Sequence, residues 1–344
     1  MASGNGVAAR RRLAALGMAA GVATGAAVRP LPAAPARSGD AAAARFPDRP
    51  VRILVPFAAG GTTDLIARAL AERLAARFGQ PVAVDNWGGG GGAVAGETFA
   101  RSEPDGHTLL VATASLIAIN KALRPDLPFD PETQFVLIAM LAQQPNVLVV
   151  NPRALPQVRT LPELIAQAKA RPGQLTYASA GAGTQLHLTG AMLAAEAGIA
   201  IVHVPYRGAG PALADLIAGQ VTMMFDGLGS VLPHLRAGTL RAVAVAGEAP
   251  HPALPGVKPV AATLPGFLSV NWTGLFGLRG TPEPVVERLA AETRKALETP
   301  EVRRLFAERA FDPMPIPRAA LPVFLEAERR RWGEAVRRSG ARVE

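Results

Sequence analysis

The stretch "AAGGTTD" places Thr62, Thr63 and Asp64 directly after Gly60 and Gly61, at the end of an apolar run. Glycines let a ligand approach the backbone closely, and Thr and Asp commonly begin helices. The N–H groups of a first helical turn are free, and the helix dipole there favours negative charge. The stretch therefore predicts an anion site, although a turn that only caps its own helix would have the same composition.

A second glycine-bearing turn, "YASAGAGTQLH", repeats this arrangement with Ser179, Gly181, Gly183 and Thr184. Two such turns suit a small ligand whose carboxylates are held from both sides. Neither turn carries Lys or Arg. A carboxylate is therefore expected rather than a multiply charged phosphate.

Other polar residues stand where apolar strands end. Asp226 ends "VTMMFD", and Thr113, Ser115 and Asn120 follow "LLVAT". Asp226 could accept a hydrogen bond from a ligand hydroxyl or amine, repel the wrong anion, or cap the next turn. Ser115, Asn120 and Asp226 are retained as candidate ligand-binding residues.

Histidines and glycines elsewhere indicate structural roles. His187 is expected to be a packed, hydrogen-bonded side chain, and His203 to be structural. The five histidines have no metal-site spacing and the chain has no cysteine, so no metal or cofactor is expected. The glycine run Gly88–Gly92 fits neither nucleotide-binding motif and is interpreted as a loop at the rim of a cleft.

The apolar periodicity predicts alternating strands and helices, and hence right-handed βαβ units with mostly parallel sheets. The expected strands cover 51–57, 81–86, 107–115, 147–151, 175–181, 201–206, 221–227 and 240–247. The expected helices cover 63–78, 92–102, 160–173, 184–198, 210–219, 284–297 and 321–338. Thr160 is the expected cap of its helix, with Pro162 in the first turn.

These elements predict an α/β protein of two lobes, each a central sheet flanked by helices. Residues 46–145 with 246–344 form the first lobe and residues 146–245 the second, so the chain crosses between them twice. Ligands bind beyond the carboxyl ends of the strands in such sheets, and the strand ends of two lobes can face one cleft.

Residues 1–45 indicate an export signal followed by a linker. Arg10, Arg11 and Arg12 precede an uncharged run of 16 residues, Leu13–Val28, and small residues follow. The arginines fit a twin-arginine signal or the general secretory route. A retained signal anchor is the alternative. An exported chain without cysteine points to the periplasm.

The overall charge gives little support for nucleic-acid binding. Six arginines and one aspartate lie in residues 1–45, so their removal lowers the formal charge from +9 to +4. Aromatic residues make up only 5% of the chain, and no basic stripe interleaves with them.

Several motifs in order resemble the Bug family of periplasmic solute-binding proteins, the receptors of tripartite tricarboxylate transport systems. They are "RILVPFAAGGTTD", "DNWGGGGG", "PDGHTLL", "LPFDP", "YASAGAGTQLHL", "VPYRG", "LIAGQV" and "WTGLFGLRGTP". The resemblance implies a type II-like clamshell with the ligand between its lobes. It also implies that the turns Phe57–Thr63, Ala59 included, and Ser179–Thr184 hold carboxylates through N–H groups, hydroxyls and water. The chain departs from the family where Ala59 replaces the usual proline.

The resemblance implies a binding protein, most simply a monomer, that delivers a small carboxylate to membrane permease subunits of a tripartite transporter. Two alternatives stay open at this point. The chain could signal to a sensor protein, which would leave the same sequence features. It could also be a periplasmic serine hydrolase, although "YASAG" has Tyr177 where the esterase motif requires glycine.

Overall fold

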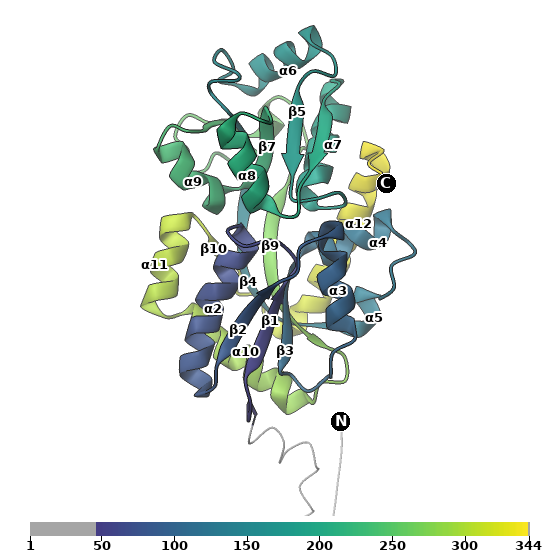
Figure 1. Ribbon diagram of the computed structural model, residues 1–344, viewed down its shortest axis with the longest axis vertical. Coiled ribbons are helices and arrows are strands. Elements are labelled where there is room, and N and C mark those ends of the chain that lie inside the picture. The colour runs from purple at the N-terminus through teal and green to yellow at the C-terminus, as the bar shows by residue number, and fades with distance from the viewer. Residues whose placement is uncertain (1–45, 343–344) are drawn as a thin grey trace, which may run out of the picture. The chain divides into compact units, whose positions relative to one another are not determined.

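The computed structural model describes residues 46–342 and has the expected α/β architecture (Figure 1). The predicted export signal lies outside the described residues. Within them, ten strands form two sheets that share one long strand, β4 (Phe135–Val150).

Sheet A has the strand order β2-β1-β3-β9-β4. Its strands are β1 (Val51–Val55), β2 (Val82–Asn86), β3 (Thr108–Thr113), β9 (Val270–Leu278), the first part of β4, and the short β10 (Asp312–Pro313). Strands β2, β1 and β3 are parallel, whereas β9 is antiparallel to both β3 and β4.

Sheet B is built on the second part of β4. It contains β5 (Thr176–Ser179), β6 (Val202–Pro205), β7 (Met223–Gly227) and β8 (Arg241–Val245). Strands β6, β5 and β7 are parallel, and β4 is antiparallel to β7 and β8. The expected parallel pairing is therefore found in three strands of each sheet, β2-β1-β3 and β7-β5-β6, and both sheets are mixed where β4 enters.

Three passes of the chain meet where β4 leaves sheet A. The Asn146 N–H donates to Ser269 O at 3.1 Å, and the Ser269 and Ala246 N–H groups donate to Ala246 O and Asn146 O at 2.7 Å each. We call these three residues the junction. The division into lobes 46–145 plus 246–344 and 146–245 stays a prediction, and two junction residues, Asn146 and Ala246, lie at its boundaries.

Helices cover the sheets on both faces. The longer ones are α2 (Thr62–Phe78), α3 (Ala93–Ala100), α6 (Leu161–Ala170), α7 (Gln185–Ala197), α8 (Ala209–Ala218), α9 (Leu228–Arg236), α10 (Glu283–Leu297), α11 (Pro300–Arg309) and α12 (Leu321–Ser339). Short turns are η1 (Gly90–Gly92), η2 (Ser115–Ile119), α4 (Asn120–Leu123), α5 (Pro131–Gln134), η3 (Val260–Ala262) and η4 (Arg318–Ala320).

Local sequence explains where two of the expected helices begin and end. In α2, Ile66, Leu70 and Leu74 recur at helical spacing and are buried, and the helix ends at Gly79 with φ +65°. In α6, Thr160 and Glu163 form a capping box, and proline occupies the first turn as expected.

Strand β9, the first part of β4, and helices α9 and α11 were not expected from the sequence. Pro145 inside "FVLIAMLAQQPNVLVV" argues against a continuous strand, because proline cannot donate to a ladder. The structure tolerates it because β4 changes sheets there: Pro145 is the last residue paired with β9, and Asn146 the first paired with β7.

The C-terminal helix α12 is fastened to β9 through one buried carboxylate. Glu328, 7% exposed, accepts hydrogen bonds from the indole N–H of Trp272 at 2.6 Å and of Trp332 at 2.9 Å. Both indoles are buried, and Arg331 lies 3.4 Å from the other carboxylate oxygen. Because β9 also pairs with β4, this contact ties α12 to the middle of sheet A.

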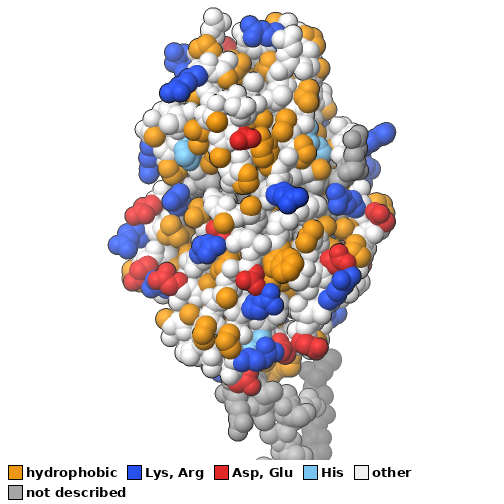
Figure 2. Space-filling view, viewed as in Figure 1, with side chains coloured by type: hydrophobic (Ala, Val, Ile, Leu, Met, Phe, Trp, Pro, Cys, Tyr) orange, Lys and Arg blue, Asp and Glu red, His pale blue; other side chains and the backbone are white. Residues whose placement is uncertain are grey.

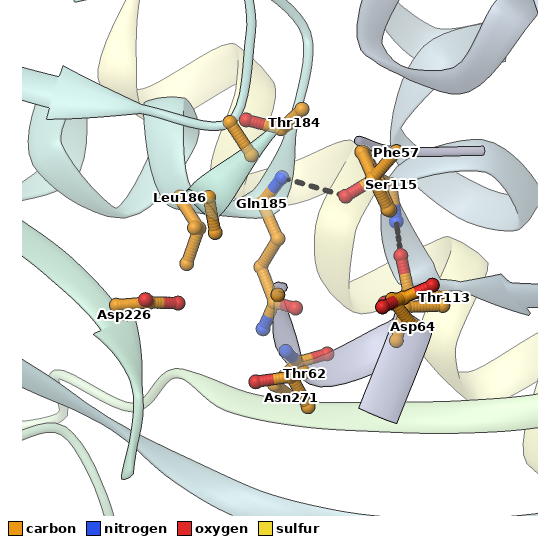
Figure 3. Close-up of a pocket in the computed structure, with 14 residues that line it drawn as sticks. Phe57, Thr62, Asp64, Thr113, Ser115, Thr184, Gln185, Leu186, Asp226 and Asn271 are labelled. Carbon is orange, nitrogen blue, oxygen red and sulfur yellow. Dashed lines mark hydrogen bonds between the residues drawn. The ribbon is translucent and has the colours of Figure 1, made fainter. Parts of the chain in front are cut away.

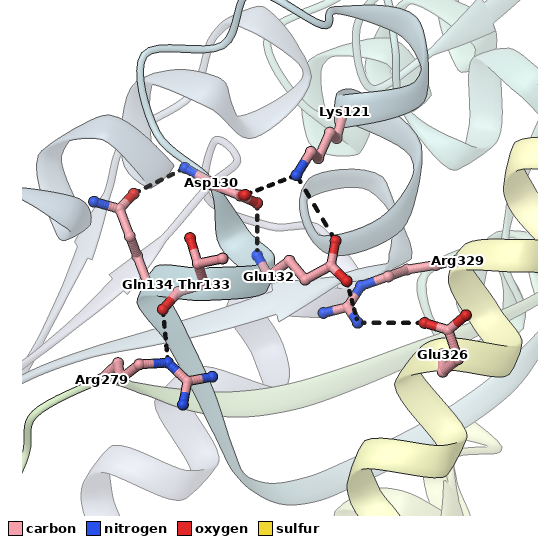
Figure 4. A network of polar contacts seen from close by, with 8 residues as sticks. All are labelled: Lys121, Asp130, Glu132, Thr133, Gln134, Arg279, Glu326 and Arg329. Carbon is pink, nitrogen blue, oxygen red and sulfur yellow. Dashed lines mark hydrogen bonds and ion pairs between the residues drawn. The ribbon is translucent and has the colours of Figure 1, made fainter.

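A polar network joins α12 to the connection before β4 (Figure 4). Glu132 is within 3.5 Å of Arg329 and 3.7 Å of Lys121, and Lys121 donates to Asp130 at 2.7 Å. Arg279, just after β9, donates to Thr133 O at 2.6 Å. These groups are partly exposed, so they orient the segment more than they stabilise it.

On the face shown in Figure 2, basic and acidic side chains are interspersed. Among residues 46–342, no helix is long and apolar enough to cross a membrane. The same residues contain no group of three His, Cys, Asp or Glu side chains that could hold a metal ion.

Candidate functional site

A pocket lies where the loops after β1 and β5 meet (Figure 3). Residues from both sheets line it. Eight of the predicted site residues are among them: Phe57, Gly61, Thr62, Thr63, Asp64, Ser115, Thr184 and Asp226. Thr113, also considered from the sequence, lines it too.

The start of α2 presents free N–H groups to this pocket. The helix has no side-chain cap, and its first backbone hydrogen bond runs from the Leu65 N–H to Gly61 O at 3.1 Å. Among the described residues, the N–H groups of Thr62, Thr63 and Asp64 therefore have no acceptor. This is the arrangement that an anion completes.

Asp64 holds the α2 loop in shape and is less available to a ligand. Its carboxylate accepts from the Gly60 N–H, from Arg68 and from Asn86, each at 3.0 Å. Burial would raise the pKa of Asp64, but these hydrogen bonds outweigh burial and hold the pKa below its usual value. Asn86 also donates to Phe57 O at 2.9 Å. Asp64 is therefore a charged anchor whose charge Arg68 compensates.

The start of α7 is largely self-paired, unlike that of α2. The Gly183 N–H donates to His187 Nδ1 at 3.2 Å, and the Gln185 N–H donates to Ser115 Oγ at 2.9 Å, as Figure 3 shows for the latter. The Thr184 hydroxyl donates to Gly181 O at 2.7 Å and accepts from the His187 N–H at 3.3 Å. The two turns resemble each other in sequence, yet only that of α2 keeps several free donors.

Replacing Thr184 by Ala should lower the free energy of unfolding by about 1 kcal/mol, because the cap of α7 is lost. Thr184→Ser keeps the hydroxyl and should stay within about 0.5 kcal/mol of the wild type. Denaturant unfolding monitored by circular dichroism measures both. An equal loss in the two variants would contradict the capping role.

Three stacked rings, those of Tyr177, His187 and His203, pack beside the turn Ser179–Thr184. The His187 and His203 ring centroids are 4.0 Å apart, and those of Tyr177 and His203 are 4.9 Å apart. Burial lowers the pKa of His187, and burial together with His187 lowers the pKa of His203 to about 3. Both rings are therefore neutral at pH 7. Neither lines the pocket, as expected for structural histidines.

Asp226 lies in the pocket wall without a cation. It is 2% exposed, and its carboxylate accepts from the Gly227 N–H at 2.8 Å and from the Ser230 hydroxyl at 2.7 Å. Burial raises the pKa of Asp226 to about 6, although these two hydrogen bonds oppose the rise. The lining residues include no Lys or Arg.

This raised pKa predicts how the stability of the unliganded protein depends on pH. The contribution of Asp226 to stability is fully present below the usual pKa of 3.8 and is lost as the pH rises through about 6. The slope is at most about 1.4 kcal/mol per pH unit for one proton. Unfolding experiments from pH 4 to 7.5 should show this slope in the wild type and not in Asp226→Asn. Equal slopes would contradict the assignment.

Six predicted site residues do not line the pocket: Ala59, Gly60, Asn120, Ser179, Gly181 and Gly183. They shape the loops that do. The fully buried Asn120 donates to Gly91 O at 3.1 Å, and Ser179 lies 2.6 Å from His203 Nε2. Local sequence could not separate residues that form the turn from residues that face its open side.

Five lining residues were not predicted: Ala180, Gln185, Leu186, Ala209 and Asn271. Gln185 directly follows the predicted site residue Thr184, so its position in the first turn of α7 was a usable signal. Asn271 lies on β9, a strand that was not expected, and no local signal pointed to it.

Backbone contacts close the rim of the pocket. The Ala58 N–H donates to Arg207 O at 3.1 Å, joining the loop after β1 to the loop after β6. A Cβ atom on Gly88 would lie 2.6 Å from Arg207 O, and one on Gly91 would lie 2.6 Å from Ala182 O. Gly88 and Gly91 are thus required for the close approach of these loops, and the interpretation of the glycine run as a cleft-rim loop stays a prediction.

Several known proteins have sequences similar to this chain. The family model described as "Tripartite tricarboxylate transporter family receptor" matches residues 66–341. A UPF0065 protein of Pseudomonas sp. is 41% identical over 259 residues, 75% of this chain and 76% of that protein. Protein BugT of Bordetella pertussis is 35% identical over 300 residues, 87% of this chain and 91% of that protein.

Solved structures share both the fold and the sequence relationship. R. palustris Rpa4515 with adipate has a TM-score of 0.82 and 32% identity, covering 87% of this chain and 100% of that chain. MatC from Rhodopseudomonas palustris with bound malate has a TM-score of 0.80 and 34% identity, covering 85% of this chain and 100% of that chain. The chain therefore belongs to the tripartite tricarboxylate transporter receptor family of two-lobed periplasmic solute-binding proteins.

Proposed function

We propose that this protein captures a small carboxylate in the pocket between α2 and α7 and delivers it to the membrane subunits of a tripartite transporter. The observation that carries the proposal is the uncapped first turn of α2, whose free N–H groups face a pocket without Lys or Arg. Neutral donors at a helix start suit a carboxylate. The adipate and malate bound by two relatives support the same ligand class.

Closure of the pocket is the step that gives affinity. The Ser115–Gln185 and Ala58–Arg207 hydrogen bonds each join a segment that follows a strand of sheet A to a segment that follows a strand of sheet B. Each charge-assisted hydrogen bond to a bound carboxylate can add about 1.5–3 kcal/mol once water is excluded. A ligand shifts an open–closed equilibrium only by its differential affinity for the two forms, so these contacts set how strongly ligand favours the closed form.

The exported chain acts in the periplasm as a monomer, and its closed form is the one that docks on the membrane partner. We infer binding and not hydrolysis as its role. Ser179 lies 2.6 Å from His203 Nε2, but it is fully buried and does not line the pocket, so a substrate could not reach its hydroxyl.

The proposal is tested by thermal shift and calorimetry with adipate, malate, citrate, glutarate and aspartate, each beside its neutral amide or ester. Carboxylates should bind and the neutral analogues should not. Gly61→Val should weaken binding of the best ligand, because its methyl groups meet Ala209 across the pocket, where a Cβ already lies at 3.5 Å.

Gly61→Ala is the matched control, since its Cβ makes only an ordinary contact with Ala209. Equal binding of an acid and its neutral analogue would contradict the proposal. Wild-type affinity in Gly61→Val would show that the ligand binds elsewhere.

A further inference from the structure

One wall of the pocket presents hydrogen-bond acceptors that lack donors. Gln185 is 2% exposed, and its side-chain Nε2 donates to Val270 O at 2.7 Å. That bond fixes the orientation of the Gln185 amide. The Val270 carbonyl oxygen can accept a hydrogen bond from the amide N–H group, but it cannot bond to the amide oxygen, because neither oxygen carries a hydrogen. The opposite atom, Gln185 Oε1, is buried and has no hydrogen-bond partner among the described residues.

Asp226 adds a negative charge to this wall. Asp64 is paired with Arg68 at 3.0 Å, whereas the two hydrogen bonds to Asp226 come from neutral groups, Gly227 N–H and the Ser230 hydroxyl. In Figure 3 the Asp226 carboxylate points toward the end of the Gln185 side chain. A buried charge and an unpaired buried acceptor are both costly, so neither suits a site for a purely anionic ligand.

Asn271 completes the wall. Its Oδ1 is also buried and has no partner within residues 46–342. No backbone contact from these residues fixes its amide, so it can turn to offer either an acceptor or a donor. The acceptors of Gln185 and Asp226 do not have this freedom.

The pocket therefore has two sides of opposite character. The first turn of α2 offers N–H donors to a carboxylate, and the wall formed by Gln185 and Asp226 offers only acceptors. We propose that the ligand carries an ammonium group beside its carboxylate, as an amino acid does, and that this group donates to Gln185 Oε1 and Asp226. This inference rests on the proposed function and narrows its ligand class.

The acceptors in this wall distinguish an ammonium-bearing acid from a hydroxy acid and from a plain dicarboxylate. A hydroxy acid could donate to one acceptor, but it would leave the charge of Asp226 uncompensated. A plain dicarboxylate would provide no donor and would add negative charge near Asp226. An ammonium group provides up to three donors together with the missing positive charge.

The test compares ligands that differ only in this group. Calorimetry at pH 7.5 with wild-type protein uses L-aspartate, L-malate and succinate as one set, and L-glutamate and glutarate as another. The amino-bearing member of at least one set should bind at least tenfold more tightly than its plain dicarboxylate. Asp226→Asn and Gln185→Met should each reduce that ratio to about threefold or less.

Stability provides an independent readout for the variants. Asp226→Asn should raise the Tm of the unliganded protein at pH 7.5, because it removes the uncompensated charge. If that variant does not fold, the ratio measured with Gln185→Met decides alone. Gly333→Ala, on the remote helix α12, serves as a control and should leave the ratio unchanged.

The outcomes distinguish this inference from the proposed function. Tighter binding of succinate or glutarate than of the amino acids would overturn the inference and leave the carboxylate function standing. An unchanged ratio in both variants would overturn it as well. If no acid of either set or of the broader panel binds, the proposed function fails, and the inference fails with it.

Discussion

Replacing Gly88 by Ala should weaken carboxylate binding about a hundredfold, equivalent to about 2.7 kcal/mol, because it opposes the contact between two loops at the rim of the pocket. In the structure, where the two loops meet, a Cβ at this position would lie 2.6 Å from Arg207 O and 3.3 Å from Ala58 N. Both atoms belong to the backbone, and they form the hydrogen bond that joins the two loops at the rim. The added methyl group therefore opposes closure directly.

The expected result has a specific signature. Binding weakens in calorimetry, and the Tm falls less without ligand than with it, since unliganded loops can separate to relieve the clash. Gly333→Ala on α12 is the matched control, because its Cβ would have no closer neighbour than the flexible Arg337 side chain at 3.7 Å. Wild-type affinity in Gly88→Ala would show that the rim contact does not contribute to binding.

Glu328→Ala should lower the free energy of unfolding by about 3–5 kcal/mol. The substitution leaves the indole N–H groups of Trp272 and Trp332 buried without an acceptor and removes the ion-pair partner of Arg331. An unsatisfied buried donor costs about 1–3 kcal/mol, so two donors account for most of this loss. Guanidinium unfolding monitored by tryptophan fluorescence reports on both indoles.

Glu328→Gln separates the hydrogen bonds from the charge. The glutamine carbonyl can still accept from the indoles, so this variant should lose about 1–2 kcal/mol, less than half of the loss in Glu328→Ala. If Glu328→Ala unfolds at the same denaturant concentration as the wild type, α12 is not fastened by this carboxylate. In that case the role assigned to Glu328 is wrong.

Features set by nearby residues could be predicted from the sequence. The α2 turn, the cap of α6 and the place of Thr184 at a helix start depend on residues within a few positions of each other. The same reasoning located Phe57, Thr62 and Asp226 at strand or helix ends that face the pocket. For such residues the local backbone decides the position of the side chain.

Features set by distant partners could not be predicted. The sequence suggested two equivalent helix starts, but His187 and Ser115 occupy the N–H groups of one of them. Asn271 enters the pocket from a strand whose place depends on β3 and β4 on either side. Such contacts depend on how the sheets pair, and no short stretch of sequence encodes that pairing.

Strand β4 belongs to both sheets, and at the junction the backbones of Asn146, Ala246 and Ser269 bond to one another. Unfolding of either sheet would remove part of the strand on which the other sheet is built. A calorimetric scan of the unliganded protein should accordingly record a single endotherm whose van't Hoff and measured enthalpies agree. By the same logic, neither half should survive as a separately expressed fragment.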